Sequence, residues 1–240
     1  MKKSKLKLDK NSDVLEGFDW GITKGWFRKE LVKEFTEYKG GQYQVDFKVD
    51  KGDIVFDFGA SIGPFVWQIK DQEPSKVICI EPSESMIGAL VRNCQTTNLD
   101  CEVFKCGIGS ISGEENLLAF GADGEATNIT LPTLTFMDIV KNANVDKIDF
   151  LKTDCEGGEY SIFNNTNIWW IKENVKKIVG EWHCQTPKEK EQFKVFRETY
   201  LRLFPKFKIY SIDMFDITDN LWRDMFLDYY NQVIIYIDNR

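Results

Sequence analysis

The chain has 240 residues and a mass of 27.9 kDa, which is the size of one large domain. Hydrophobic residues make up 42% and charged residues 29%, so the composition excludes a wholly disordered chain. With 31 Lys and Arg against 38 Asp and Glu, the net charge is −7. Because contacts to nucleic-acid phosphates need clustered cations, we expect no nucleic-acid partner.

The sequence contains no apolar run of about 18 residues, so we expect no transmembrane helix and no membrane partner. The basic start over residues 1–8 lacks an apolar core, and we therefore expect no secretory signal and a cytoplasmic location. Six cysteines with no Cys-x-x-Cys pair, and a single histidine, argue against a zinc cage.

We predict an N-terminal helical extension over residues 1–45 and a main domain over residues 46–240. Aromatic and apolar residues recur at helix-like spacing in the extension, which indicates an amphipathic helix that packs on the main domain or forms a homodimer contact. The alternation of polar and apolar residues over 42–49 predicts a short strand. The helix prediction rests on Trp20, Trp26, Phe27, Leu31, Phe35 and Tyr38.

From residue 51 onward, predicted strands alternate with helical patterns, which is typical of βαβ units and a mostly parallel sheet. Helices are expected over 65–70, after Ser83, over 160–164, and after the capping-box pattern of residues 186–189. Residues 107–135 are turn-rich, with polar alternation and little helix signal. The predicted strands cover residues 54–58, 77–80, 103–104, 148–153, 177–182, 207–212 and 231–237.

Parallel sheets bind ligands beyond the carboxyl ends of their strands, and a glycine loop follows the first predicted strand. The loop from Asp57 to Gly63 permits close backbone approach, but it departs from the dinucleotide pattern G-x-G-x-x-G. Asp57 would repel a pyrophosphate, whereas it suits a cationic ligand. Glu81 ends the second strand, where it is placed to accept hydrogen bonds from a ribose diol. A plain turn and a helix-starting acid remain the structural alternatives.

Two further groups follow later strands. Asp154, Glu156 and Glu159 lie close together in sequence, and such crowding suits a bound cation, a substrate hydroxyl or an amine. His183, the only histidine, ends the fifth strand and is a natural general base near neutral pH. A solvated loop and a structural histidine are the alternatives that remain open.

These motifs resemble those of the FkbM-type family of S-adenosylmethionine-dependent methyltransferases. The resemblance covers roughly residues 45–185, with the motifs in the family's order, and the fourth motif is the most specific. The matching stretches are VFDFGASIGPF (55–65), ICIEPS (78–83), CGIGSISG (106–113), IDFLKTDCEGGE (148–159) and GEWH (180–183).

The resemblance implies a Rossmann-like class I methyltransferase, with a seven-stranded, mostly parallel sheet, an antiparallel last strand and helices on both faces. It also implies S-adenosyl-L-methionine as cofactor and O-methylation of a sugar, glycan or small natural product. Its cofactor contacts would be Asp57, Gly59, Ala60 and Gly63 at the methionine end, Glu81 and Pro82 at the ribose, Cys106, Gly107 and Ile108 near the adenine, and Asp154 and Glu156 at the reacting centre.

For catalysis we expect His183 to act as the base, oriented by Asp154 or Glu181, without a metal. The alternative is a Mg²⁺-type ion shared by Asp154 with Glu181 or His183, which would lower the pKa of the acceptor hydroxyl. A nicotinamide-dependent oxidoreductase is disfavoured by the missing G-x-G-x-x-G. A non-catalytic binding module is disfavoured by the intact glycines and by Glu81.

Overall fold

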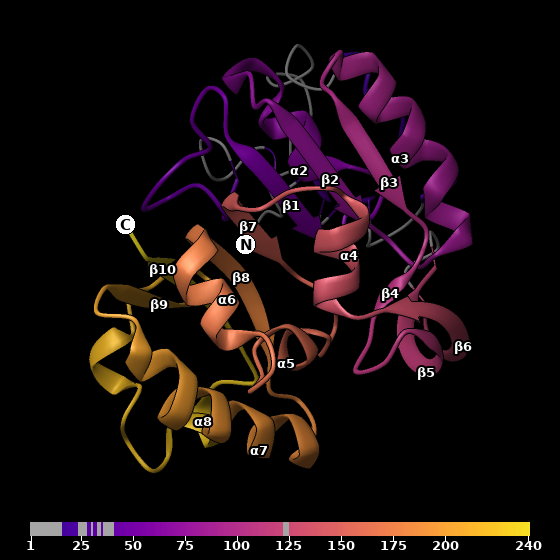
Figure 1. Ribbon diagram of the computed structural model, residues 1–240. Coiled ribbons are helices and arrows are strands. Elements are labelled where there is room, and N and C mark those ends of the chain that lie inside the picture. The colour runs from indigo at the N-terminus through magenta and orange to yellow at the C-terminus, as the bar shows by residue number, and fades with distance from the viewer. Residues whose placement is uncertain (1–15, 24–27, 30, 33–34, 36–40, 122–124) are drawn as a thin grey trace, which may run out of the picture.

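A computed structural model describes residues 16–23, 28–29, 31–32, 35, 41–121 and 125–240. Its main feature is a seven-stranded sheet in the order β3-β2-β1-β7-β8-β10-β9 (Figure 1). The first five strands in this order run parallel, whereas β10 is antiparallel to both β8 and β9. The fold class predicted from the sequence is confirmed. The strands are β1 (Ile54–Phe58), β2 (Lys76–Ile80), β3 (Cys101–Phe104), β7 (Ile148–Thr153), β8 (Val175–His183), β9 (Phe207–Ser211) and β10 (Gln232–Asp238).

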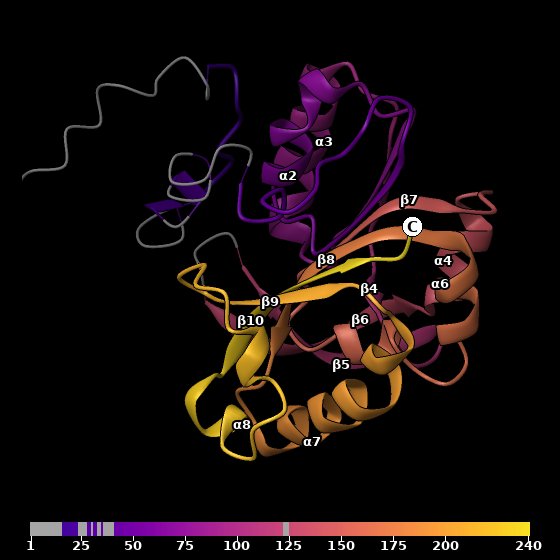
Figure 2. The same cartoon turned by 90° about the vertical axis from the view of Figure 1, so that its left-hand side faces the viewer.

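Helices cover both faces of this sheet (Figure 2), which is why its strands read as nearly continuous apolar runs. Along β1, Val55 faces the core beneath α2 and α3, whereas Phe56 and Phe58 face the core beneath α4, α6 and α7. Successive side chains of a strand point to opposite faces, so each strand contributes to both cores. The helices are α2 (Pro64–Gln68), α3 (Glu84–Thr97), α4 (Phe136–Asn142), α5 (Glu159–Ile162), α6 (Ile168–Asn174), α7 (Pro187–Val195) and α8 (Phe226–Tyr229).

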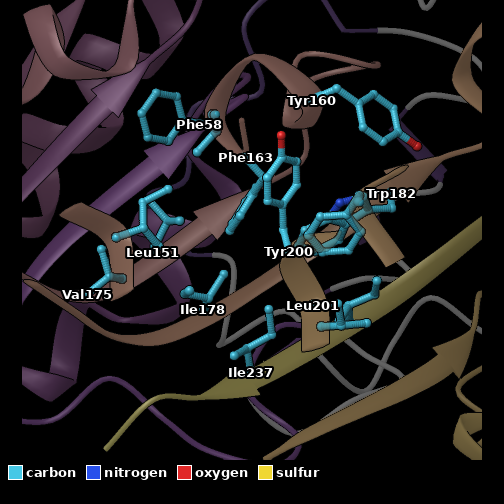
Figure 3. Close-up of a cluster of buried hydrophobic side chains, with 14 of the residues drawn as sticks. Phe58, Leu151, Tyr160, Phe163, Val175, Ile178, Trp182, Tyr200, Leu201 and Ile237 are labelled. Carbon is cyan, nitrogen blue, oxygen red and sulfur yellow. The ribbon is translucent and has the colours of Figure 1, made fainter. Parts of the chain in front are cut away.

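The larger core fixes the carboxyl end of β8 (Figure 3). The Trp182 ring stacks on Phe196 with ring centroids 5.0 Å apart, and it also packs against Phe163. Tyr160 donates a 2.6 Å hydrogen bond from its hydroxyl to the main-chain oxygen of His183. These contacts hold the last residue of the strand, and with it the imidazole that follows the strand's apolar run.

A second, three-stranded sheet has the order β4-β6-β5 and is built from residues that the sequence predicted as turn-rich. Much of β5 and β6 is exposed, so polar residues on the solvated faces mask the strand pattern. Thr135 then caps α4, because its hydroxyl accepts the N–H of Asp138 at 3.2 Å. This sheet comprises β4 (Gly107–Ile108), β5 (Gly113–Phe120) and β6 (Ala126–Leu134).

The strand predicted over residues 42–49 is wrong: this segment forms turns. Several of its main-chain groups bond to side chains, most of them from elsewhere in the chain. The hydroxyl of Tyr236 on β10 donates to the Gln42 carbonyl and accepts the Val45 N–H at 2.9 Å. Tyr43 and Val49 are buried, so the alternation reports burial without sheet pairing.

Part of the predicted N-terminal helix falls within the described residues. Leu31 and Phe35 are helical and pack in one cluster with Phe18, Ile62 and Trp67. Trp26, Phe27 and Tyr38 lie outside the described residues. The boundary between an extension over 1–45 and a domain over 46–240 stays a prediction.

The predicted capping box is confirmed at the start of α7. Thr186 accepts the N–H of Glu189, and the Glu189 carboxylate accepts the N–H of Thr186 at 2.8 Å.

Among the described helices, none combines the length and apolar character needed to cross a bilayer.

Candidate active site

A cavity of about 740 Å³ lies at the carboxyl ends of β1, β2, β7 and β8. Most of the residues that the sequence assigned to a site line this cavity. The others, Asp57, Ala60, Gly63 and His183, are buried and do not belong to its lining. The predicted site residues in the lining are Gly59, Glu81, Pro82, Cys106, Gly107, Ile108, Asp154, Glu156 and Glu181.

The glycine loop is pressed against the end of β7. Gly59 has a φ of 77°, and a β-carbon there would lie 1.7 Å from the main-chain oxygen of Asp154. Gly63, which precedes α2, has a φ of 88°. Glycine is needed at both positions because other residues rarely adopt this backbone conformation. The result is bare main chain at the floor of the cavity, where a ligand can approach closely.

Glu81 is 6% exposed and is held by the backbone on both oxygens. Oε2 accepts the N–H of Ser61 at 2.8 Å, and Oε1 accepts the N–H of Ser83 at 2.7 Å. Burial raises the pKa of Glu81 to about 7, although these two hydrogen bonds act in the opposite direction. Each carboxylate oxygen has a second lone pair, so this oriented group can accept two hydroxyls of a ribose.

Asp57 is fully buried and forms an ion pair of 2.9 Å with Lys152. The two residues face each other directly across the parallel pair β1 and β7. Lys152 also donates to the Gly59 carbonyl at 2.8 Å, and it lines the cavity. Burial raises the pKa of Asp57, although Lys152 acts in the opposite direction. No sequence motif predicted a role for Lys152. The one feature that sets it apart in the sequence is its charge within an apolar strand.

Four carboxylates and one imidazole meet at the ends of β7 and β8. His183 is 1% exposed, and its Nε2 lies 3.2 Å from Glu156 Oε2 and 3.7 Å from Glu181 Oε1. Its Nδ1 lies 3.4 Å from Glu159 Oε1. Burial by itself lowers the pKa of His183, but the surrounding carboxylates outweigh it and raise that pKa well above its ordinary value. Burial raises the pKa of Glu156 to about 7 and that of Glu181 to about 8.

Asp154, the fourth carboxylate, is fixed by a residue that the sequence analysis placed in a strand. Tyr43 donates its hydroxyl to Asp154 Oδ2 at 2.8 Å, and the Tyr43 ring lies 5.2 Å from the Lys152 ammonium. The sequence predicted that Asp154 or Glu181 orients His183. Of these two, Glu181 is within ion-pair distance of the imidazole.

The residues expected near an adenine line one side of the cavity. Cys106 and Ile108 are 5% and 4% exposed, and burial raises the pKa of the Cys106 thiol to about 11. Gly107 packs so closely on Leu117 that a β-carbon would lie 2.5 Å from its side chain. These small and apolar groups suit the flat face of a base.

These features fit S-adenosylmethionine. One cavity is lined by the Gly59 loop, by the carboxylate of Glu81 and by the small and apolar residues from Cys106 to Ile108. The same cavity presents acidic groups, which suit a cationic sulfonium. Structures of methyltransferases are similar to the chain at low sequence identity. Fibrillarin from Aeropyrum pernix, with natively bound S-adenosyl-L-methionine, is 12% identical, has a TM-score of 0.43, and aligns over 91% of this chain and 76% of its own. Precorrin-6y C5,15-methyltransferase from Geobacter metallireducens is 11% identical, has a TM-score of 0.43, and aligns over 90% and 89%. An rRNA methylase from Streptococcus thermophilus is 10% identical, has a TM-score of 0.45, and aligns over 79% and 88%.

No curated protein matches the chain significantly in sequence. The family model for the methyltransferase FkbM domain matches residues 48–204, which is more than half of the chain and includes the glycine loop, Glu81 and the carboxylate cluster. The chain therefore belongs to the FkbM methyltransferase family and is an S-adenosylmethionine-dependent methyltransferase.

Proposed function

We propose that the protein methylates a hydroxyl group of a sugar, a glycan or a small natural product. The observation that carries this proposal is that cofactor-type residues and three carboxylates of the cluster around His183 line one cavity. A methyl donor and a proton-accepting group are the two requirements of O-methylation, and both have candidate residues here.

When bound, S-adenosylmethionine supplies a methyl group already activated on a sulfonium. We assign Glu81 to its ribose, the Gly59 loop to its methionine end, and Cys106 and Ile108 to its adenine. Lys152 holds the loop in place by its bond to the Gly59 carbonyl and balances the buried charge of Asp57. Most of the rate enhancement then comes from positioning the acceptor oxygen.

The rest of the lining supports a hydroxyl-rich acceptor. Four glutamines line the cavity, and a primary amide both donates and accepts hydrogen bonds, as a polyol requires. Gln185 lies just before α7 and Gln192 lies within it. Gln42 and Gln232 come from distant parts of the chain.

An acceptor hydroxyl has to lose its proton as it attacks. We propose that the proton leaves to one of the carboxylates that line the cavity beside His183, namely Asp154, Glu156 or Glu181. General-base assistance of this kind contributes about 10²–10⁴-fold.

The test has two parts. Calorimetry with S-adenosylmethionine and S-adenosylhomocysteine should give saturable binding to wild type and at least about tenfold weaker binding to Glu81→Ala, since a hydrogen-bonded charged group contributes about 1.5–3 kcal/mol. Release of S-adenosylhomocysteine should then be followed with sugars, phenols, amines and RNA as acceptors. Failure to bind the cofactor, or transfer confined to amines or RNA, would contradict the proposal.

A further inference from the structure

We propose that Asp154, Glu156 and His183 form a binding site for one divalent cation at the edge of the cavity. Each of these residues offers one ligand atom, and the three atoms lie within 4.8 Å of one another. They come from two pieces of backbone: the loop after β7, which carries Asp154 and Glu156, and the end of β8, which carries His183. The imidazole from the neighbouring strand distinguishes the group from carboxylates that are merely neighbours in sequence.

The buried imidazole is an independent observation that points to a metal. His183 is 1% exposed, and its Nδ1 has no hydrogen-bond partner among the described residues but lies 3.4 Å from the buried Glu159 carboxylate. Its Nε2 is turned toward Glu156, with Glu181 slightly farther away. Metal-ligating histidines commonly present one ring nitrogen to the metal and the other to a carboxylate. His183 and Glu159 have this relationship before any ion is bound.

Supporting groups already hold one carboxylate ligand and the loop of the other. Glu159 accepts the N–H of Cys155 at 2.9 Å and the N–H of Gly157 at 3.0 Å, so it holds the backbone on both sides of Glu156. Tyr43 fixes the Asp154 carboxylate by the bond to Oδ2. Because these contacts already order the loop and one of its carboxylates, less reorganisation is needed for an ion to bind.

The local charges also favour a bound cation. Glu159 and Glu181 are buried beside the imidazole, Asp154 and Glu156 are half-buried, and Lys152 pairs with Asp57 and the Gly59 carbonyl. Carboxylates held this close repel one another, which opposes the ionised form of each. A divalent cation would offset this repulsion.

Two carboxylates and one imidazole suit Mn²⁺ or Mg²⁺, with water or substrate oxygens completing the shell. Asp154 and Glu156 line the cavity, so the remaining positions face the acceptor side. The role of the ion in catalysis rests on the proposed function: it would hold and acidify the acceptor hydroxyl. The acceptor oxygen bonds to the methyl carbon as the carbon–sulfur bond breaks, and the electron pair of the broken bond stays on sulfur. The proton of the acceptor hydroxyl passes to Glu181.

The test is titration of the metal-stripped full chain with MnCl₂, followed by calorimetry and by electron paramagnetic resonance of free Mn²⁺. We expect one site per chain, displaced by Mg²⁺. Binding should weaken at least about tenfold in Asp154→Asn, Glu156→Gln and His183→Gln, since each loses a first ligand. Glu115→Gln is the matched control, because Glu115 lines the same cavity outside the cluster.

Melting curves with and without Mn²⁺ show whether each variant is folded. Mn²⁺ should raise the melting temperature of wild type and of Glu115→Gln but not that of Glu156→Gln. The absence of saturable Mn²⁺ binding to wild type, or equal loss in Glu115→Gln, would overturn the site. Titration with S-adenosylmethionine distinguishes this failure from failure of the proposed function, because the two ligands are measured independently.

Discussion

Gly59 lies against the main-chain carbonyl of Asp154, and a β-carbon at residue 59 would come within 1.7 Å of that oxygen. The contact joins the cofactor loop after β1 to the acidic end of β7. Lys152 strengthens the same junction, because it pairs with Asp57 and donates to the Gly59 carbonyl. The two halves of the site are therefore packed directly on each other.

We expect Gly59→Ala to weaken S-adenosylmethionine binding at least about tenfold, because the loop has to move away from Asp154 to admit the methyl group. Gly52→Ala is the control: Gly52 has a φ of 84°, but a methyl group added there would meet no atom of the described part of the chain within 4 Å. That variant carries only the backbone strain, about 1–2 kcal/mol, and should bind the cofactor normally. Calorimetry and melting curves of both variants check this, and equal binding would contradict it.

Cofactor affinity should rise with pH through the pKa of Glu81, which burial raises to about 7. The ionised carboxylate can accept hydrogen bonds from two hydroxyls, whereas the protonated form has fewer acceptor sites. The affinity for the cofactor should therefore increase about tenfold from about pH 6 to about pH 8. Glu81→Gln should bind more weakly and lose this slope. A Gln variant that keeps the wild-type slope would assign the titration to another group.

The same shift has a consequence for stability. The folded state of an acid with a raised pKa binds more protons than the unfolded state, so the contribution of Glu81 becomes less favourable as pH rises from its ordinary value of 4.5 to about 7. Without cofactor, wild type should lose stability over this window relative to Glu81→Gln. Urea unfolding of both proteins across the window measures the difference.

Lys152→Met should destabilise the protein by about 3–5 kcal/mol, because it leaves Asp57 buried without its cation. Adding Asp57→Asn to that variant should restore part of the loss, since the uncompensated charge is gone. Chemical denaturation of the wild type, both single variants and the double variant gives the coupling energy. Strict additivity of the two single effects would show that the pair does not interact.

His183→Ala should lower turnover by about 10²–10⁴-fold while leaving S-adenosylmethionine affinity near that of wild type, because the imidazole lies outside the cofactor contacts. Stopped assays with saturating cofactor, with circular dichroism as the folding control, test this. Unchanged turnover would remove His183 from the reaction.

The sequence was sufficient for the main sheet because its central strands β1, β2, β7 and β8 are almost wholly buried and each is followed by a distinctive polar or glycine-rich segment. It identified the positions of Glu81, Asp154 and Glu156 for that reason. It missed the role of Lys152, because the register that places Lys152 opposite Asp57 is a property of the paired strands and of neither strand alone.

Two other differences have specific physical causes. The Gln42 carbonyl and the Val45 N–H bond to the Tyr236 hydroxyl, a partner 191 residues beyond Val45 that no short-range pattern reveals. The strands β5 and β6 are largely exposed, and solvated faces carry the polar residues that resemble turns. The first difference therefore depends on a distant side chain, and the second depends on exposure to solvent.

The bond between Tyr236 and the Gln42–Val45 turn also links the site to the last strand of the chain. Tyr43, which holds Asp154, is anchored beside a residue of β10, and β10 itself lies between β8 and β9. Local opening of β10 should therefore also loosen the wall of the cavity at Asp154, although β10 contributes no carboxylate to the cluster.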